Sequence, residues 1–187
     1  AAHNTEYQYA EEVLRNTTTN GTIYKDQTGK VYEQKISQLA LANLDYDYRN
    51  RHHLSYNFMM VHDNVQSVGD YDGMDSGKFN DDYDNMGFTR RQQANDNWLL
   101  VNQLMTNWGL TKTLSFDAGA SYNVVKGSEP DRRINNLRKA AEGYTLLEGN
   151  SQQRYFSELN ENDLNVKAGL TYRLADDQEE ISNIRIG

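Results

Sequence analysis

This 187-residue chain has no cysteine, one proline and few cationic side chains. Without cysteine it can form neither a disulfide framework nor a thiolate metal site. Its 19 Lys and Arg against 27 Asp and Glu give a formal net charge of -8, which disfavours a nucleic acid as partner, because phosphate binding requires a basic surface. No apolar run approaches about 18 residues and the mean hydropathy is -0.90, so the sequence predicts neither a transmembrane helix nor the apolar segment of a signal peptide.

Two stretches alternate strictly between apolar and polar residues. In residues 114–125 the even-numbered positions are apolar or small. In residues 164–174 the even-numbered positions are again apolar, and the odd-numbered positions include the charged side chains of Lys167 and Arg173. A period of two is the pattern of a β-strand. Such an apolar face either packs on a second sheet of a soluble sandwich or faces lipid in an outer-membrane barrel whose charged face lines a wet lumen.

About six strands of this kind are expected along the chain. They lie at 36–48, 54–61, 97–108, 114–125, 164–174 and from 181 onward. Short turns at 49–52, 109–113 and 175–180 alternate with long stretches without pattern at 63–96 and 126–163. Long loops are uncommon in compact soluble domains, whereas outer-membrane barrels combine short periplasmic turns with long outer loops and girdles of aromatic residues.

The sequence therefore predicts an all-β fold, an antiparallel transmembrane β-barrel segment with long outer loops and short periplasmic turns. Residues 1–34 are expected to form an outer loop with a small hairpin whose turn contains Gly29. Residues 35–187 are expected to supply strands and loops that are part of a larger barrel. The competing interpretation is a soluble secreted β-sandwich that binds glycans, with an acidic loop that could hold calcium.

The runs VKGSEPDRRINNL at 125–137 and GYTLLEGNSQQRYFSELNENDLNVKAGLTYRL at 143–174 resemble the barrel region of TonB-dependent outer-membrane receptors from Bacteroides-type bacteria. The run at 68–104 is similar to the preceding outer loop and strand of such proteins. The resemblance implies a bacterial outer-membrane protein with a barrel of about 22 strands around a plug domain. This sequence has no plug, no TonB-contacting segment and no aromatic-ended closing strand, so it looks like an internal piece of a longer chain.

The same resemblance implies a function and a set of partners. The parent protein would import a bulky nutrient of the siderophore, glycan or peptide class, with energy from a TonB-type protein. Its other contacts would be outer-membrane lipid, the remaining strands and plug of the parent chain, and a surface lipoprotein. We expect no enzymatic activity, because no nucleophile and base or phosphate-binding loop stands out in the sequence.

Four arginines in the expected outer loops are candidate ligand-binding residues: Arg90, Arg91, Arg132 and Arg133. The planar guanidinium suits carboxylate or phosphate groups, although pairing with the aspartates of the neighbouring loop is the alternative use. Those aspartates are the candidate metal ligands: Asp70, Asp72, Asp75, Asp82 and Asp84. Acidic loops that contain glycine can supply oxygen ligands to calcium, but the EF-hand spacing is incomplete, and a solvated acidic loop is the alternative.

Overall fold

The computed structural model describes residues 1–49, 51–79, 84–147, 152–174 and 183–186, and every regular element in it is a β-strand. The strands are β1 (Ala2–Thr17), β2 (Ile23–Tyr48), β3 (His52–Asp75), β4 (Met86–Gly109), β5 (Leu114–Lys139), β6 (Tyr144–Leu146), β7 (Gln153–Arg173) and β8 (Asn183–Ile186). In the part of the chain described, no helix has the length and hydropathy that a membrane crossing requires. The expected all-β, antiparallel fold is confirmed.

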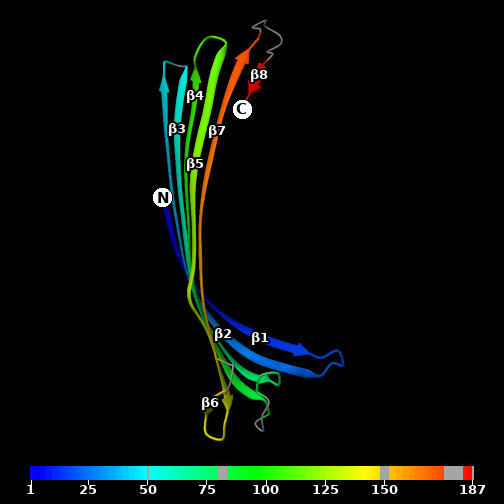
Figure 1. Ribbon diagram of the computed structural model, residues 1–187. Helices are drawn as coiled ribbons and strands as arrows, with labels where there is room; N and C mark the ends of the chain where they lie inside the picture. Colours follow the sequence, from blue (N-terminus) through cyan, green and yellow to red (C-terminus); the bar gives the residue numbers. More distant parts are fainter. Residues whose placement is uncertain (50, 80–83, 148–151, 175–182, 187) are drawn as a thin grey trace.

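The strands form one antiparallel sheet in the order β1-β2-β3-β4-β5-β7-β8, with the short β6 paired to β5. Strands β2 to β5 have 24 to 26 residues each, which corresponds to about 80 Å of extended chain. Figure 1 shows them side by side along most of their length, straight at one end and curving at the other, where the tips of β1 and β2 turn away. The sheet is open, and it does not close into a barrel within the described residues.

The connections lie at two opposite ends of the sheet. Because neighbouring strands are antiparallel, the β2–β3 and β4–β5 connections share the straight end, and the β3–β4 connection lies at the curved end (Figure 1). This confirms the expectation that the turns at 49–52 and 109–113 lie on one side. The third expected turn, at 175–180, lies outside the described residues.

The prediction of two long loops at 63–96 and 126–163 is largely wrong. Strand β3 continues to Asp75 and β4 begins at Met86, while β5 continues to Lys139 and β7 begins at Gln153. The extensions carry polar side chains on both faces, so they lack the apolar alternation by which a half-buried strand is recognised. The ladders of the β3 extension are nevertheless continuous, as in the register from Lys25↔Asp75 to Tyr48↔His52, and those of the β5 extension are each interrupted only by one shift of register.

The loop and hairpin expected at 1–34 also differ from the structure. Residues Ala2–Thr17 form β1, which pairs along β2, and β2 runs through residue 34 without a break. The turn lies at 18–22, where Gly21 has a φ of 81°. Gly29 lies within β2 opposite Tyr71, and a Cβ there would be 2.5 Å from the Tyr71 ring. A close approach of an aromatic ring, and not a turn, explains this glycine.

One face of the straight end is apolar over five successive cross-strand rows, which we call the apolar band. Its members are Ala40, Ala42, Leu44, Tyr46 and Tyr48 of β2, His52, Leu54, Tyr56, Phe58 and Met60 of β3, Leu100, Asn102, Leu104, Thr106 and Trp108 of β4, Phe116, Ala118, Ala120, Tyr122 and Val124 of β5, and Asn162, Leu164, Val166, Ala168 and Leu170 of β7. Four of its polar side chains form two pairs within it, because Tyr56 donates to Asn102 (2.8 Å) and Tyr122 donates to Asn162 (3.4 Å).

The apolar band is not covered by any described part of the chain. Leu44 is 67% exposed and Val166 74%, and the only buried hydrophobic side chains among the described residues are Tyr71 and Phe79, at the other end of the sheet. Leu170 is likewise exposed, whereas Phe58 and Ala118 are half-buried by their neighbours in the sheet. The sheet therefore presents its apolar band without the second layer that a sandwich requires.

The opposite face of the same rows is mostly polar, although its row nearest the curved end carries Leu41, Met59 and Val101. One row places Asn43, Asn57, Gln103, Ser121 and Asn165 side by side across five strands. The amide of Asn43 donates to Asn57 at 2.6 Å. The adjacent rows add charged side chains on this face, including those of Lys167 and Asp117. This polar face has the composition of a surface in contact with water.

Candidate functional site

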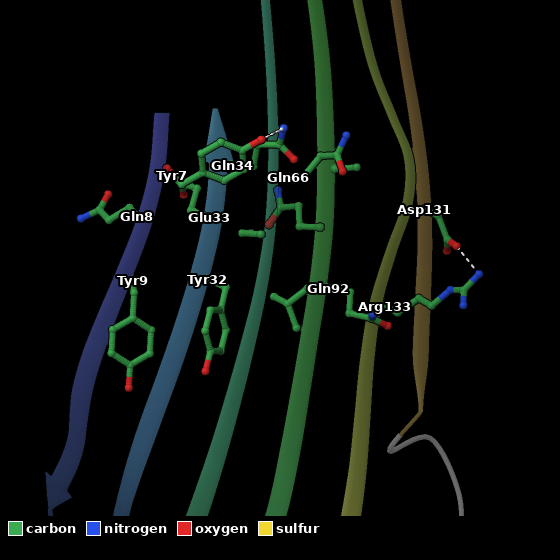
Figure 2. A pocket seen from close by; sticks show the side chains of 14 residues that line it. Tyr7, Gln8, Tyr9, Tyr32, Glu33, Gln34, Gln66, Gln92, Asp131 and Arg133 are labelled. Carbon is green, nitrogen blue, oxygen red and sulfur yellow. Dashed lines mark hydrogen bonds and ion pairs between the residues drawn. The ribbon is translucent and has the colours of Figure 1, made fainter. Parts of the chain in front are cut away.

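Beyond the apolar band, on the same face and toward the curved end, the sheet forms a hollow of about 660 Å³. We define the hollow by the lining side chains that share this face: Tyr7 and Tyr9 of β1, Tyr32 and Gln34 of β2, Gln66 and Val68 of β3, Gln92 and Ala94 of β4, and Asp131 and Arg133 of β5. Figure 2 shows tyrosines at one side of the hollow and the Asp131–Arg133 pair at the other.

The tyrosine side of the hollow is held by cross-strand contacts between β1 and β2. The rings of Tyr9 and Tyr32 lie 5.1 Å apart with an interplanar angle of 43°, and both remain about half exposed. Gln34 donates from Nε2 to the hydroxyl of Tyr7 at 3.1 Å. The hydroxyl of Tyr9 donates to Glu11 at 2.7 Å, and this bond with the carboxylate raises the pKa of Tyr9 to about 12. The hydroxyl groups of Tyr7 and Tyr9 are thus held by hydrogen bonds, and the rings of Tyr9 and Tyr32 remain exposed apolar surfaces.

The arginine side carries a net positive charge. Arg154 of β7 donates to Asp131 from Nε at 2.7 Å and from Nη2 at 3.0 Å, and Arg133 forms a second ion pair with the same carboxylate. The two bonds from Arg154, followed by those from Arg133, lower the pKa of Asp131 to about 2. One carboxylate thus faces two guanidinium groups, each about half exposed, so one positive charge remains for an anion in solution.

A β-bulge at the only proline brings Arg133 to this face. Register is kept from Gly109↔Ser115 to Asp96↔Ser128 and resumes at Gln92↔Arg133, so β5 contributes one residue more than β4 over this interval. Pro130 lies in the extra stretch, where its missing N–H costs no ladder bond. Before the bulge, the even-numbered residues of β5 lie on the face of the hollow, and after the bulge the odd-numbered residues lie on that face. Arg133 consequently points to the hollow, and Arg132 points to the opposite face.

The four candidate arginines are not brought together. Arg90 is engaged by Asp70 through two bonds of 2.7 Å, which confirms the alternative that it pairs with the aspartates. Arg91 lies on the opposite face, 5.1 Å above the ring of Tyr71. Arg132 lies 4.5 Å above the ring of Tyr155 and 3.6 Å from Glu129. Of the four, only Arg133 lines the hollow.

The candidate metal ligands do not form a cage in the described residues. Asp70 and Asp72 share one face, but Asp70 is bound by Arg90 and Asp72 accepts a bond of 2.5 Å from the Tyr144 hydroxyl. Asp75 lies on the other face, 3.7 Å from the ammonium of Lys25. Asp84 is in a turn with a φ of 56°, and Asp82 lies outside the described residues. No three acidic, histidine or cysteine side chains converge in the parts of the chain that are described.

A small buried cluster, which we call the tip cluster, lies on the polar face at the curved end. Tyr71 lies against Gly29 and Gly69, and its hydroxyl donates to Glu12 at 3.1 Å. Phe79, from the connection after β3, is fully buried against Gly87. Residues 76–79, which follow β3, therefore fold back onto the polar face.

Lys78 and Asn136 extend the tip cluster. Thr89 donates to the Asn136 side-chain oxygen at 2.8 Å, and the ammonium of Lys78 lies 3.3 Å from the same oxygen. Burial lowers the pKa of Lys78, since the charged form loses water. The polar side chains in this cluster are thus anchored to one another.

The tyrosines of the hollow were missed by sequence reasoning. The sequence predicts a loop around Tyr7 and Tyr9 and a small hairpin around Tyr32. The spacing of two between Tyr7 and Tyr9 is the one available signal, because residues two apart share a face of a strand. Comparison of the chain with protein-family models, curated proteins and solved structures finds no match.

Proposed function

We propose that this chain is a segment of a transmembrane β-barrel from an outer-membrane receptor of the TonB-dependent class, which imports a bulky nutrient. The observation that carries the proposal is the height of the exposed apolar band. The chain's two tryptophans, Trp98 and Trp108, lie on the band's face ten residues apart on β4, one at each border. Ten residues span about 33 Å along a strand, or about 25 Å in height at a barrel tilt of about 40°, which is the height of a lipid-facing band.

Both borders of the band carry amphipathic aromatic groups. At the border toward the curved end, Trp98 stacks on His62 at 3.7 Å with an interplanar angle of 13°, and the imidazole of His62 lies 2.6 Å from Asp96. At the border beside the turns, Trp108 contacts His52 at 4.8 Å. Aromatic side chains with a polar group are enriched at both faces of a bilayer, where one end meets lipid and the other meets water.

The free edges of the sheet also support a barrel. Within the apolar band, residues 40–48 of β2 have no described partner on the edge that β1 pairs elsewhere, and β7 has no described partner on its outer edge before Leu170. A long unpaired edge favours pairing with another strand. Within a bilayer the N–H and C=O groups of such an edge find hydrogen-bond partners only if the sheet closes into a barrel. In the proposed parent protein the remaining strands pair with these two edges, and the plug contacts the polar face.

Strand extensions with water on both sides fit the part of the barrel outside the membrane. Beyond Trp98 both faces carry charges, as in the Arg90–Asp70 pair on one face and the Lys25–Asp75 pair on the other. The tip cluster holds residues 76–79 on the polar face, which becomes the inner wall of the proposed barrel. This narrows the outer opening beside the surface that the nutrient meets.

The lipid-facing assignment is tested by spin labels at neighbouring residues of opposite facing. In the full-length parent protein in lipid, a label at Val166→Cys should be relaxed by oxygen, which concentrates in the bilayer, and a label at Lys167→Cys by a water-soluble nickel chelate. Leu104→Cys and Gln103→Cys form a second pair. The segment itself has no cysteine to interfere. Equal access of the nickel chelate to both members of each pair would overturn the barrel.

The receptor class is tested separately from the barrel. The open reading frame around residues 1–187 should encode an N-terminal plug domain and a segment that contacts a TonB-type protein. Uptake of the nutrient should then require that energising protein. A frame with neither element would refute the receptor class and leave the membrane barrel standing.

A further inference from the structure

We propose that the hollow binds the saccharide part of a membrane glycolipid, with sugar rings against Tyr9 and Tyr32 and an anionic substituent of the saccharide at Arg133. This rests on the proposed function, because it requires the apolar band to lie in a bilayer. The hollow is then on the outer surface of the barrel and not in the lumen. It is therefore separate from the surface that would bind an imported nutrient.

The position of the hollow relative to the band points to a lipid-linked ligand. Gln38 lies in the row of Trp98, at the border of the band, and Tyr32 lies six residues further along the same strand. Six residues correspond to about 20 Å along the strand. The polar headgroup region continues a few ångströms beyond the hydrocarbon core, so the hollow lies where the saccharides of a glycolipid extend from the membrane surface.

The chemistry of the hollow fits an oligosaccharide. Exposed aromatic rings offer flat apolar surfaces of the kind that cover the C–H faces of sugars, and Tyr9 and Tyr32 present two such rings side by side. Gln92 faces the centre of the hollow, and among the described residues its amide has no side-chain partner. Amides both donate and accept, as the hydroxyl groups of a sugar require.

The arginine side of the hollow favours an anionic substituent, whereas the tyrosine side carries the Glu11 carboxylate that is bonded to Tyr9. The Asp131 carboxylate is shared by Arg133 and Arg154, so the three side chains together carry one positive charge. The pKa of Asp131 is held at about 2, so this balance is kept throughout the neutral and mildly acidic range. A phosphate or carboxylate on the saccharide can therefore be bound by the guanidinium groups.

The experiment measures binding to the full-length parent protein in detergent by isothermal titration calorimetry. The probe is the water-soluble phosphorylated oligosaccharide made by deacylating lipopolysaccharide, with its dephosphorylated form for comparison. Arg133→Gln should weaken binding of the phosphorylated form about tenfold, through the loss of a charge-assisted bond, and leave the dephosphorylated form unchanged. Arg132→Gln, at the neighbouring residue on the opposite face, should leave both forms unchanged.

A second pair of variants tests the aromatic side of the hollow. Tyr32→Ala should weaken both forms about fivefold, and Tyr155→Ala, which removes an exposed tyrosine on the opposite face, should not. Tyr32→Phe keeps the ring and should retain binding, which guards against a variant that fails to fold. No binding of either form, or equal losses in the variants and their controls, would overturn the proposal.

The source of the saccharide is tested in nanodiscs. Phosphatidylcholine discs with and without lipopolysaccharide are loaded with the parent protein, and hydrogen exchange is measured around Tyr32. Slower exchange only with lipopolysaccharide, lost in Arg133→Gln, supports the lipid-linked ligand, whereas no difference between the discs overturns it. If the spin labels show a lipid-facing band and both saccharide assays fail, the hollow proposal alone is wrong. If the spin labels show no such band, the proposed function has failed first.

Discussion

An arginine introduced at successive depths of the apolar band gives the sharpest test of the bilayer assignment. Leu104 lies in the middle row of the five, and Leu170 lies two rows away, in the row of Trp108. Two rows are about 13 Å along a strand and about 10 Å in height at the tilt of a barrel. Leu104 is thus placed near the bilayer midplane and Leu170 near its interface.

The expected costs follow from this placement. Leu104→Arg should lower the free energy of unfolding of the parent barrel by about 2 to 4 kcal/mol, because the charge must enter hydrocarbon, whereas Leu170→Arg should cost about 0 to 1 kcal/mol. Gln103→Arg faces water on the polar face and should cost little. The assay is reversible denaturant unfolding of each variant in lipid vesicles.

A soluble core would also penalise Leu104→Arg, so Leu104→Phe separates the two cases. Lipid accommodates a larger apolar side chain, whereas a close-packed core resists it at a cost of about 1 to 3 kcal/mol. The bilayer assignment is wrong if Leu104→Phe destabilises by that amount. It is also wrong if Leu170→Arg costs as much as Leu104→Arg, because the depth dependence would then be absent.

Two further predictions concern the curved end. Gly29→Val should displace the Tyr71 ring and speed hydrogen exchange in the tip cluster. Adding Tyr71→Ala should remove most of the effect of the valine, because the ring with which the valine clashes is then absent. Equal exchange in wild type and Gly29→Val would contradict this. The folded-state pKa of Asp131 is depressed to about 2, so its stabilising contribution is present above the ordinary carboxyl pKa of about 3.9 and is lost as pH falls from there toward 2. An NMR titration of Asp131 should show a midpoint near 2 that rises toward the ordinary value in Arg133→Gln/Arg154→Gln; an unchanged midpoint would refute the role of the two arginines.

Several features of the fold could be predicted from the sequence alone. The apolar alternation at 114–125 and 164–174 correctly places Leu170 on one face and Lys167 on the other, because successive side chains of a strand point to opposite sides. The turns at 49–52 and 109–113 are expected at one end of the sheet, and the structure confirms this, since an antiparallel chain of strands places every second connection at the same end. Local periodicity is sufficient for both.

The length of the strands and the composition of the hollow were decided only by the tertiary structure. The strand extensions are stabilised by cross-strand pairs such as Arg90–Asp70, whose partners are 20 residues apart, and no local pattern reveals them. One extra residue at Pro130 decides that Arg133, and not Arg132, lines the hollow. A single insertion reverses the facing of every residue after it, and its position depends on how neighbouring strands pair.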